Sequence, residues 1–184
     1  LGNDTQAIEA VEKFPPWLTS VVLSLGDWMA LGYSDRFSVE RYLAKRHPNI
    51  IGLERSTEQL EQFSGMSAEG QKELLLQWLN MSAGTRLALI GEMAQMWREG
   101  DAEEMYNWYR ETARKYRGSE QAEAEFHRRL VVGRNRIMLE RLFAQLQEMQ
   151  DKRPVFVAVG ALHLGGADGL LALLKKQGYV IKAR

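Results

Sequence analysis

The sequence predicts an α/β fold, a mainly parallel sheet that carries a large helical insertion. Two apolar runs typical of buried strands, residues 50–53 and 155–159, stand far apart in the chain. The stretch between them, about residues 56–150, carries apolar residues at helical spacing. A leucine-rich stretch and a third apolar run at 179–181 follow the second run, which is the order of a strand–helix–strand crossover over 154–183.

The N-terminal part is expected to be helical up to the first strand. A proline pair at 15–16 stops a first short helical stretch, and residues 17–31 then carry apolar side chains at helical spacing. A second short helix is expected over 39–45. The helix breaker at Pro48 precedes the first strand, 50–53, which is bounded by turn signals.

Capping signals mark helix ends inside the insertion. Ser56 is followed three residues later by Gln59, a capping-box pattern. Gly100 is expected to end one helix, and Asp101 with Glu104 to begin the next. The insertion is therefore expected to consist of consecutive helices.

Composition excludes several classes of protein. Lys plus Arg equals Asp plus Glu at 24 each, so the formal net charge is zero, whereas a nucleic-acid binder usually carries a basic excess. No apolar run approaches the roughly 18 residues that are needed to span a bilayer. The absence of Cys rules out disulfides and thiolate metal sites. We expect a single domain over residues 1–184 with neither a nucleic-acid partner nor a transmembrane segment.

Two places fit the rule that ligands bind at the carboxyl ends of the strands in an open parallel sheet. Glu54 directly follows the run 50–53, and Gly160 to His163 directly follow the run 155–159. An imidazole there can ligate a metal or move a proton, and a nearby carboxylate can bind the same ion or act as general base. Each signal is weak by itself, because a glutamate after a strand is more often a surface or capping residue and Gly-x-x-His is a short pattern.

Taken in order, these residues and a few others resemble the TraB/GumN family, which includes the TIKI proteases. The strongest stretch is 157–180. The residues that carry the resemblance are 51–54 (Ile-Gly-Leu-Glu), Arg134 with Asn135, 159–164 (Val-Gly-Ala-Leu-His-Leu), 169–171, Leu174 and 178–180. The resemblance implies an α/β fold related to the TIKI and erythromycin-esterase-like proteins, and metal-dependent hydrolysis of peptides or proteins.

Site residues follow from the resemblance. Gly160 and His163 match the second of two Gly-x-x-His motifs, with His163 as a metal ligand or catalytic imidazole. Glu54 matches a Leu-Glu motif and would act at the metal and the attacking water. Arg134 and Asn135 match an Arg-Asn pair that would bind a substrate carbonyl or carboxylate, or orient the His and Glu; plain surface residues are the alternative. The implied cofactor is a divalent ion, manganese, cobalt or zinc.

The sequence departs from the family pattern at its start. The first Gly-x-x-His is absent, no strand-like segment precedes Pro15, and the chain begins at Leu1. We therefore expect that N-terminal strands are missing and that this chain carries only the second half of the site. One His and one Glu hold a divalent ion poorly, and an uncovered sheet edge favours a homo-oligomer.

Three functions remain open at this point. The first is a metal-dependent, peptidase-like hydrolase with Glu54 and His163 at the metal. The second is a peptide-binding module without turnover, and the third is an inert fragment that self-associates. Many bacterial relatives look exported, so the resemblance favours the cell envelope, while the residues themselves are equally compatible with the cytoplasm.

Overall fold

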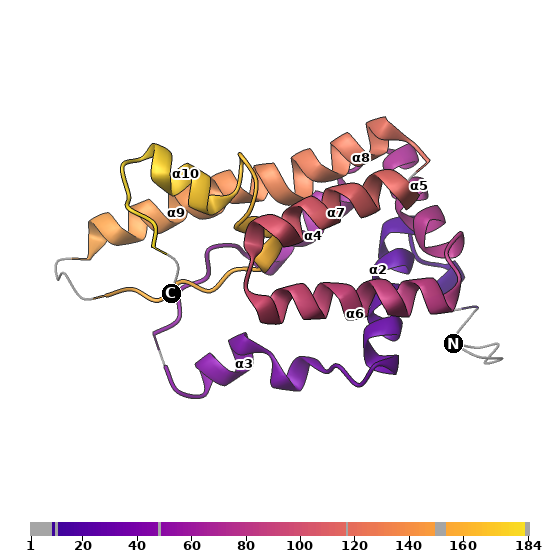
Figure 1. The fold of residues 1–184 in the computed structure, drawn as a ribbon, viewed down its shortest axis with the longest axis horizontal. Helices are drawn as coiled ribbons and strands as arrows, with labels where there is room; N and C mark the ends of the chain where they lie inside the picture. Colours follow the sequence, from indigo (N-terminus) through magenta and orange to yellow (C-terminus); the bar gives the residue numbers. More distant parts are fainter. Residues whose placement is uncertain (1–8, 10, 48, 117, 150–153, 183–184) are drawn as a thin grey trace.

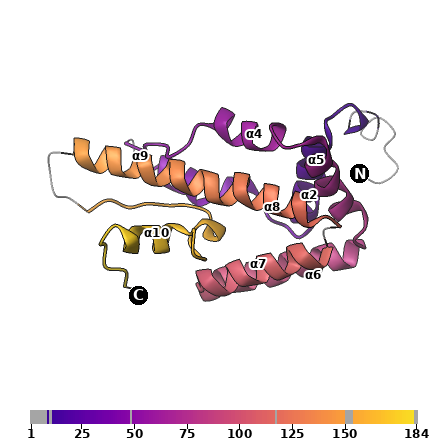
Figure 2. The ribbon, with the colours of Figure 1, turned by 90° about the horizontal axis from the view of Figure 1, so that it is seen from above.

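A computed structural model shows the chain as an assembly of packed helices (Figures 1 and 2). The structure describes residues 9, 11–47, 49–116, 118–149 and 154–182. Its α-helices are α2 (Pro16–Ala30), α3 (Val39–Ala44), α4 (Ser56–Ser64), α5 (Ala68–Leu79), α6 (Ala83–Glu99), α7 (Ala102–Tyr116), α8 (Glu120–His127), α9 (Arg134–Glu148) and α10 (Leu170–Lys176). Single turns form η1 (Asp35–Phe37) and η3 (Ala161–His163), and a π-helical stretch, η2 (Arg128–Gly133), joins α8 to α9.

The predicted α/β fold with its parallel sheet is wrong, because the described residues form helices and no β-strand. The expected strands 50–53, 155–159 and 179–181 are instead irregular segments that make no ladder with one another. Most of their apolar side chains are exposed, whereas buried strands would cover them: the exposed fraction is 62% for Ile51, 77% for Phe156 and 81% for Val180. A strand needs a neighbour to complete its backbone hydrogen bonds, and an apolar run in the sequence does not reveal whether that neighbour exists.

The helical predictions fare better. Helix α2 covers almost all of the expected 17–31, and α3 lies within 39–45. Helices α4 to α9 fill the stretch predicted as an insertion, and of the expected strand–helix–strand unit only the helix, α10, forms. The domain boundaries stay a prediction. Residues 1–8, 10, 48, 117, 150–153 and 183–184 lie outside the described residues, and with them the predicted helix breaker at Pro48 and both ends of the predicted domain.

Helices α6 and α7 form an antiparallel hairpin whose corner follows the predicted capping signals. Gly100 adopts φ 80°, and its amide donates to the carbonyl of Met96 over 3.0 Å. This left-handed conformation suits glycine, which has no Cβ. The Asp101 carboxylate then accepts from the amides of Glu103 and Glu104 over 3.0 and 2.9 Å, which caps the start of α7. Both capping predictions are confirmed.

A polar cluster joins α2 to the next helical layer. The Asp27 carboxylate accepts from Trp78 Nε1 over 2.7 Å and from Arg86 Nε over 2.8 Å. The Arg86 guanidinium also lies 3.7 Å from the centre of the Trp78 ring, a cation–π contact. The cluster thereby ties α2, α5 and α6 together. None of the described helices combines the length and the hydropathy that a bilayer span needs.

Candidate functional site

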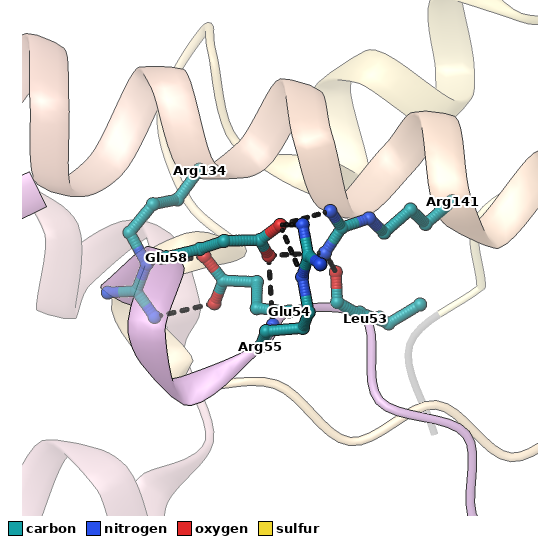
Figure 3. A network of polar contacts seen from close by, with 6 residues as sticks. All are labelled: Leu53, Glu54, Arg55, Glu58, Arg134 and Arg141. Atoms are coloured by element: carbon teal, nitrogen blue, oxygen red, sulfur yellow. Dashed lines mark hydrogen bonds and ion pairs between the residues drawn. The ribbon is translucent and has the colours of Figure 1, made fainter. Parts of the chain in front are cut away.

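Glu54 and Arg134 form a bidentate ion pair at the start of α9 (Figure 3). Arg134 Nε donates to Glu54 Oε1 over 2.9 Å, and Arg134 Nη2 donates to Oε2 over 2.8 Å. Both side chains are only about one-seventh exposed, at 14% and 15%. Such a paired geometry is stronger and more directional than a single contact. The structure thus brings two of the predicted site residues together, although they stand 80 positions apart in the chain.

A second carboxylate, Glu58, extends this network and was not predicted (Figure 3). Glu58 accepts from Arg141 Nη1 and Nη2 over 2.6 and 2.7 Å and from Arg55 Nε over 2.9 Å. Arg141 Nη1 also donates to the carbonyl of Leu53 over 3.1 Å. The hydrogen bonds from Arg141, and then those from Arg55, hold the pKa of Glu58 well below its usual range.

The same network corrects the predicted start of α4. The capping box was expected at Ser56 and Gln59, but the reciprocal contact is made one residue earlier, where the Arg55 amide donates to Glu58 Oε2 over 2.9 Å. A signal for the network is present in the sequence: Arg141 follows Arg134 by seven residues, two turns of helix, so both arginines leave α9 on one face.

His163 and Asn135 form a buried pair next to Arg134. Asn135 is fully buried and His163 is 7% exposed. Asn135 Nδ2 donates to the carbonyl of Asp168 over 2.7 Å, which leaves Asn135 Oδ1 as the acceptor for His163 Nδ1, also at 2.7 Å. The proton of the imidazole therefore lies on Nδ1, and Nε2 carries the lone pair.

The surroundings of His163 keep its imidazole neutral. Burial lowers the pKa of His163, the Arg134 cation lowers it further, and the Glu54 carboxylate opposes both, with a result of about 4. Both members of the Arg134–Glu54 pair are thus close enough to act on the imidazole electrostatically. Arg134 and Asn135 are the first two residues of α9, so the Glu54–Arg134 pair and the His163–Asn135 pair meet at the start of this helix.

Gly160 contributes less to the candidate site than the sequence predicts. Its carbonyl accepts from the His163 amide over 2.9 Å, at the turn that begins η3. Its φ is −60°, an ordinary value for any residue. A Cβ there would lie 3.5 Å from His163 Cδ2, an ordinary contact. Packing does not require glycine at this position, and a close approach of Gly160 to a ligand stays a prediction.

The described residues do not assemble a complete site for a divalent ion. In this part of the chain no group of three His, Asp or Glu side chains is placed to hold one. Both oxygens of Glu54 are engaged by Arg134. His163 alone has the character of a ligand, since its imidazole is neutral and its Nδ1 is fixed by an oxygen acceptor. The donor set thus fits one ligand of a metal site but not the site itself.

Comparison with known proteins decides the family. A sequence model of the TraB/PrgY/gumN family matches residues 2–183. The chain belongs to this family. The TraB/PrgY/gumN match confirms the resemblance seen in the sequence and extends it to essentially the whole chain. Neither the curated proteins nor the solved structures that were compared gave a match.

Proposed function

We propose that this TraB/PrgY/gumN protein is a hydrolase of peptides or proteins, and that Glu54, Arg134, Asn135 and His163 form its part of the catalytic site. The observation that carries the proposal is the convergence of a neutral, tautomerically fixed imidazole with a buried Arg–Glu pair. Such a grouping of hydrogen-bonded, charge-coupled residues is more typical of a functional site than of a core.

Each residue has a role that its contacts support. Arg134 has the planar donor set that suits a peptide carbonyl or a terminal carboxylate. A substrate that competes for this guanidinium would release Glu54 from its ion pair, and the freed carboxylate would then be available to take a proton from water. His163, with its low basicity, is suited to accept a hydrogen bond or bind a cation through Nε2. Asn135 orients the imidazole.

The proposal includes a divalent ion, which would be manganese, cobalt or zinc, and His163 is the one ligand that the described residues offer it. Such an ion would supply Lewis-acid chemistry when bound. The remaining ligands of the ion would have to come from outside the described residues, or from Glu54 after its ion pair with Arg134 is broken. The roles of Arg134, Glu54 and Asn135 do not depend on the ion, and His163 depends on it only where its Nε2 binds a cation.

Peptide hydrolysis can be measured by mass spectrometry on a mixture of unstructured peptides, with and without added manganese, cobalt or zinc. We expect cleavage to be lost in Glu54→Gln and His163→Ala and kept in the matched controls Glu61→Gln and His47→Ala, whose side chains are exposed and outside the network. Cleavage that survives in both site variants, or that is absent from the unmodified protein under every condition, would contradict the proposal.

The exposed apolar segment that leads into the site favours a second function, capture of peptides without turnover. Val155, Phe156 and Val157 are 43%, 77% and 40% exposed, and they directly precede the turn that carries His163. An extended peptide laid along them would cover this apolar surface. Peptide binding measured by calorimetry that is unchanged in Glu54→Gln, with no cleavage products, would support this function over hydrolysis.

A further inference from the structure

A glycine-rich loop, residues 164–169, connects η3 to α10 and lies against the start of α7. Two of its glycines face α7 and leave no room for a side chain there. A Cβ on Gly165 would stand 2.3 Å from the carbonyl oxygen of Ala102, and one on Gly166 would stand 2.5 Å from the ring of Tyr106. Gly166 also adopts φ 80°, which disfavours other residues. The loop can therefore approach α7 this closely only because both residues are glycine.

Polar contacts fasten the same loop to α7. The amide of Gly166 donates to Glu103 Oε2 over 2.8 Å, a charge-assisted hydrogen bond. Glu103 itself is placed by the Asp101 cap at the helix start. The ring of Tyr106 is fixed at its other end, where its hydroxyl is 2.9 Å from His127 Nε2. The start of α7 thus offers the loop a rigid surface of one carboxylate and one ring.

The other side of the loop belongs to the candidate site. The carbonyl of Asp168 accepts from Asn135 Nδ2, and Asn135 Oδ1 accepts from His163 Nδ1. A Cβ on Gly169 would lie 2.2 Å from the carbonyl oxygen of Gly165, so the loop closes tightly on itself between these contacts. A displacement at Gly166 would consequently move the Asp168 carbonyl, which orients Asn135.

We propose that Glu103 and Tyr106 are positioning residues, which hold the 164–169 loop and thereby fix the orientation of Asn135 and of the His163 imidazole. The chain of contacts runs from Glu103 to Gly166, through the loop to Asp168, and from there through Asn135 to His163. The α6–α7 hairpin is in this way coupled to the site, and a ligand that shifts the hairpin would alter the imidazole. This proposal rests on the proposed function only in taking His163 to be important for activity. The chain of contacts itself does not depend on that function.

The test uses NMR on the folded protein without any substrate. Long-range proton–nitrogen spectra report the tautomer of each imidazole, and the His163 signals are assigned with His163→Gln. In Glu103→Ala we expect His163 to change from the Nδ1-protonated form to a mixture of tautomers, and the Gly166 amide to exchange about tenfold faster, as the loss of one charge-assisted hydrogen bond implies. Glu103→Gln keeps an acceptor oxygen and should restore both signals.

Controls separate positioning from general destabilisation. Glu104→Ala changes the neighbouring exposed carboxylate of α7 and should leave His163 unaltered. Tyr106→Phe keeps the ring beside Gly166 and loses only the hydroxyl contact to His127, so it should change the tautomer less than Tyr106→Leu, which should reproduce Glu103→Ala. An unchanged His163 tautomer in a folded Glu103→Ala protein would overturn the proposal, even if Gly166 exchanged faster. Because no readout needs turnover, failure here is distinguishable from failure of the hydrolase proposal, which peptide cleavage decides.

Discussion

The imidazole of His163 shows how neighbours set the chemistry of one residue. Burial and the Arg134 cation both disfavour the charged ring, and Asn135 accepts a hydrogen bond from the Nδ1 proton that the neutral tautomer carries. The result is a ring that presents the lone pair of Nε2 at neutral pH. A free histidine near its ordinary pKa would be partly protonated and would alternate between tautomers.

The depressed pKa of His163 makes stability depend on pH in a defined window. The folded pKa is about 4 and the unfolded value is about 6.5, so between these values the unfolded chain binds a proton that the folded chain does not. The free energy of unfolding should therefore fall as the pH drops from about 6.5 to about 4, by on the order of 2–3 kcal/mol. Urea unfolding at several pH values measures this, and His163→Gln should flatten the curve. Equal pH dependence in both proteins would contradict the prediction.

Asn135 satisfies two buried partners at once, and its loss should be costly. Asn135→Ala leaves the Nδ1 proton of His163 and the carbonyl of Asp168 without their partners in a buried setting. We expect a loss of about 2–4 kcal/mol in the free energy of unfolding. Chemical denaturation checks the value. Arg136→Ala, one position further along α9, serves as the control, and a similar loss there would argue against a specific role for Asn135.

At the scale of elements, helices could be predicted because their signals are local. The helix end at Gly100 and the cap at Asp101 are each encoded within a few residues of the boundary. The segments 50–53 and 155–159 carry an equally clear apolar pattern, yet a strand exists only when another segment pairs with it. No local pattern contains that information, which is why the sheet was predicted wrongly.

The candidate site, too, could be predicted only where its residues carry a local signal in the sequence. The apolar runs that precede them point to Glu54 and His163, and the family resemblance points to Arg134 and Asn135; the structure pairs Glu54 with Arg134 and His163 with Asn135. Glu58 and Arg141 were missed, because a charged pair on helices looks like an ordinary solvated surface until the two helices are seen to meet.

The junction between α7 and the loop before α10 should tolerate no side chain at Gly165. Gly165→Ala would push a methyl group into the backbone of α7, 2.3 Å from the Ala102 oxygen, and neither backbone can yield cheaply. We expect a loss of about 3 kcal/mol or more, or failure to fold. Gly160→Ala is the matched control, since its Cβ would make only an ordinary contact of 3.5 Å. Thermal unfolding distinguishes them, and equal melting temperatures would contradict the packing argument.

At the scale of the whole molecule, exposed apolar side chains coincide with a balanced charge. Phe156 and Val180 are 77% and 81% exposed, and the formal net charge is zero with a sequence pI near 7.1. Apolar surface without net repulsion favours association.

Self-association should accordingly be strongest near neutral pH. It should depend on the exposed segments 155–159 and 179–181, which the sequence predicts as strands. In sedimentation velocity we expect a concentration-dependent increase in mass that Phe156→Lys and Val180→Lys reduce. Phe37→Lys is the control, because Phe37 is similarly exposed, at 73%, but belongs to η1 and not to those segments. A monomer at all concentrations, or equal effects of all three substitutions, would contradict the prediction.

The cluster of Asp27, Trp78 and Arg86 makes one indole an optical reporter of tertiary structure. The Asp27 carboxylate at the indole N–H and the Arg86 guanidinium over the ring both impose an electric field on Trp78, and the contribution of the carboxylate exists only while α2 is docked on α5 and α6. The emission of Trp78 should therefore differ from that of an indole in water, and should change when α2 undocks. The chain thus contains its own probe of whether its helical layers are assembled, without any label being attached.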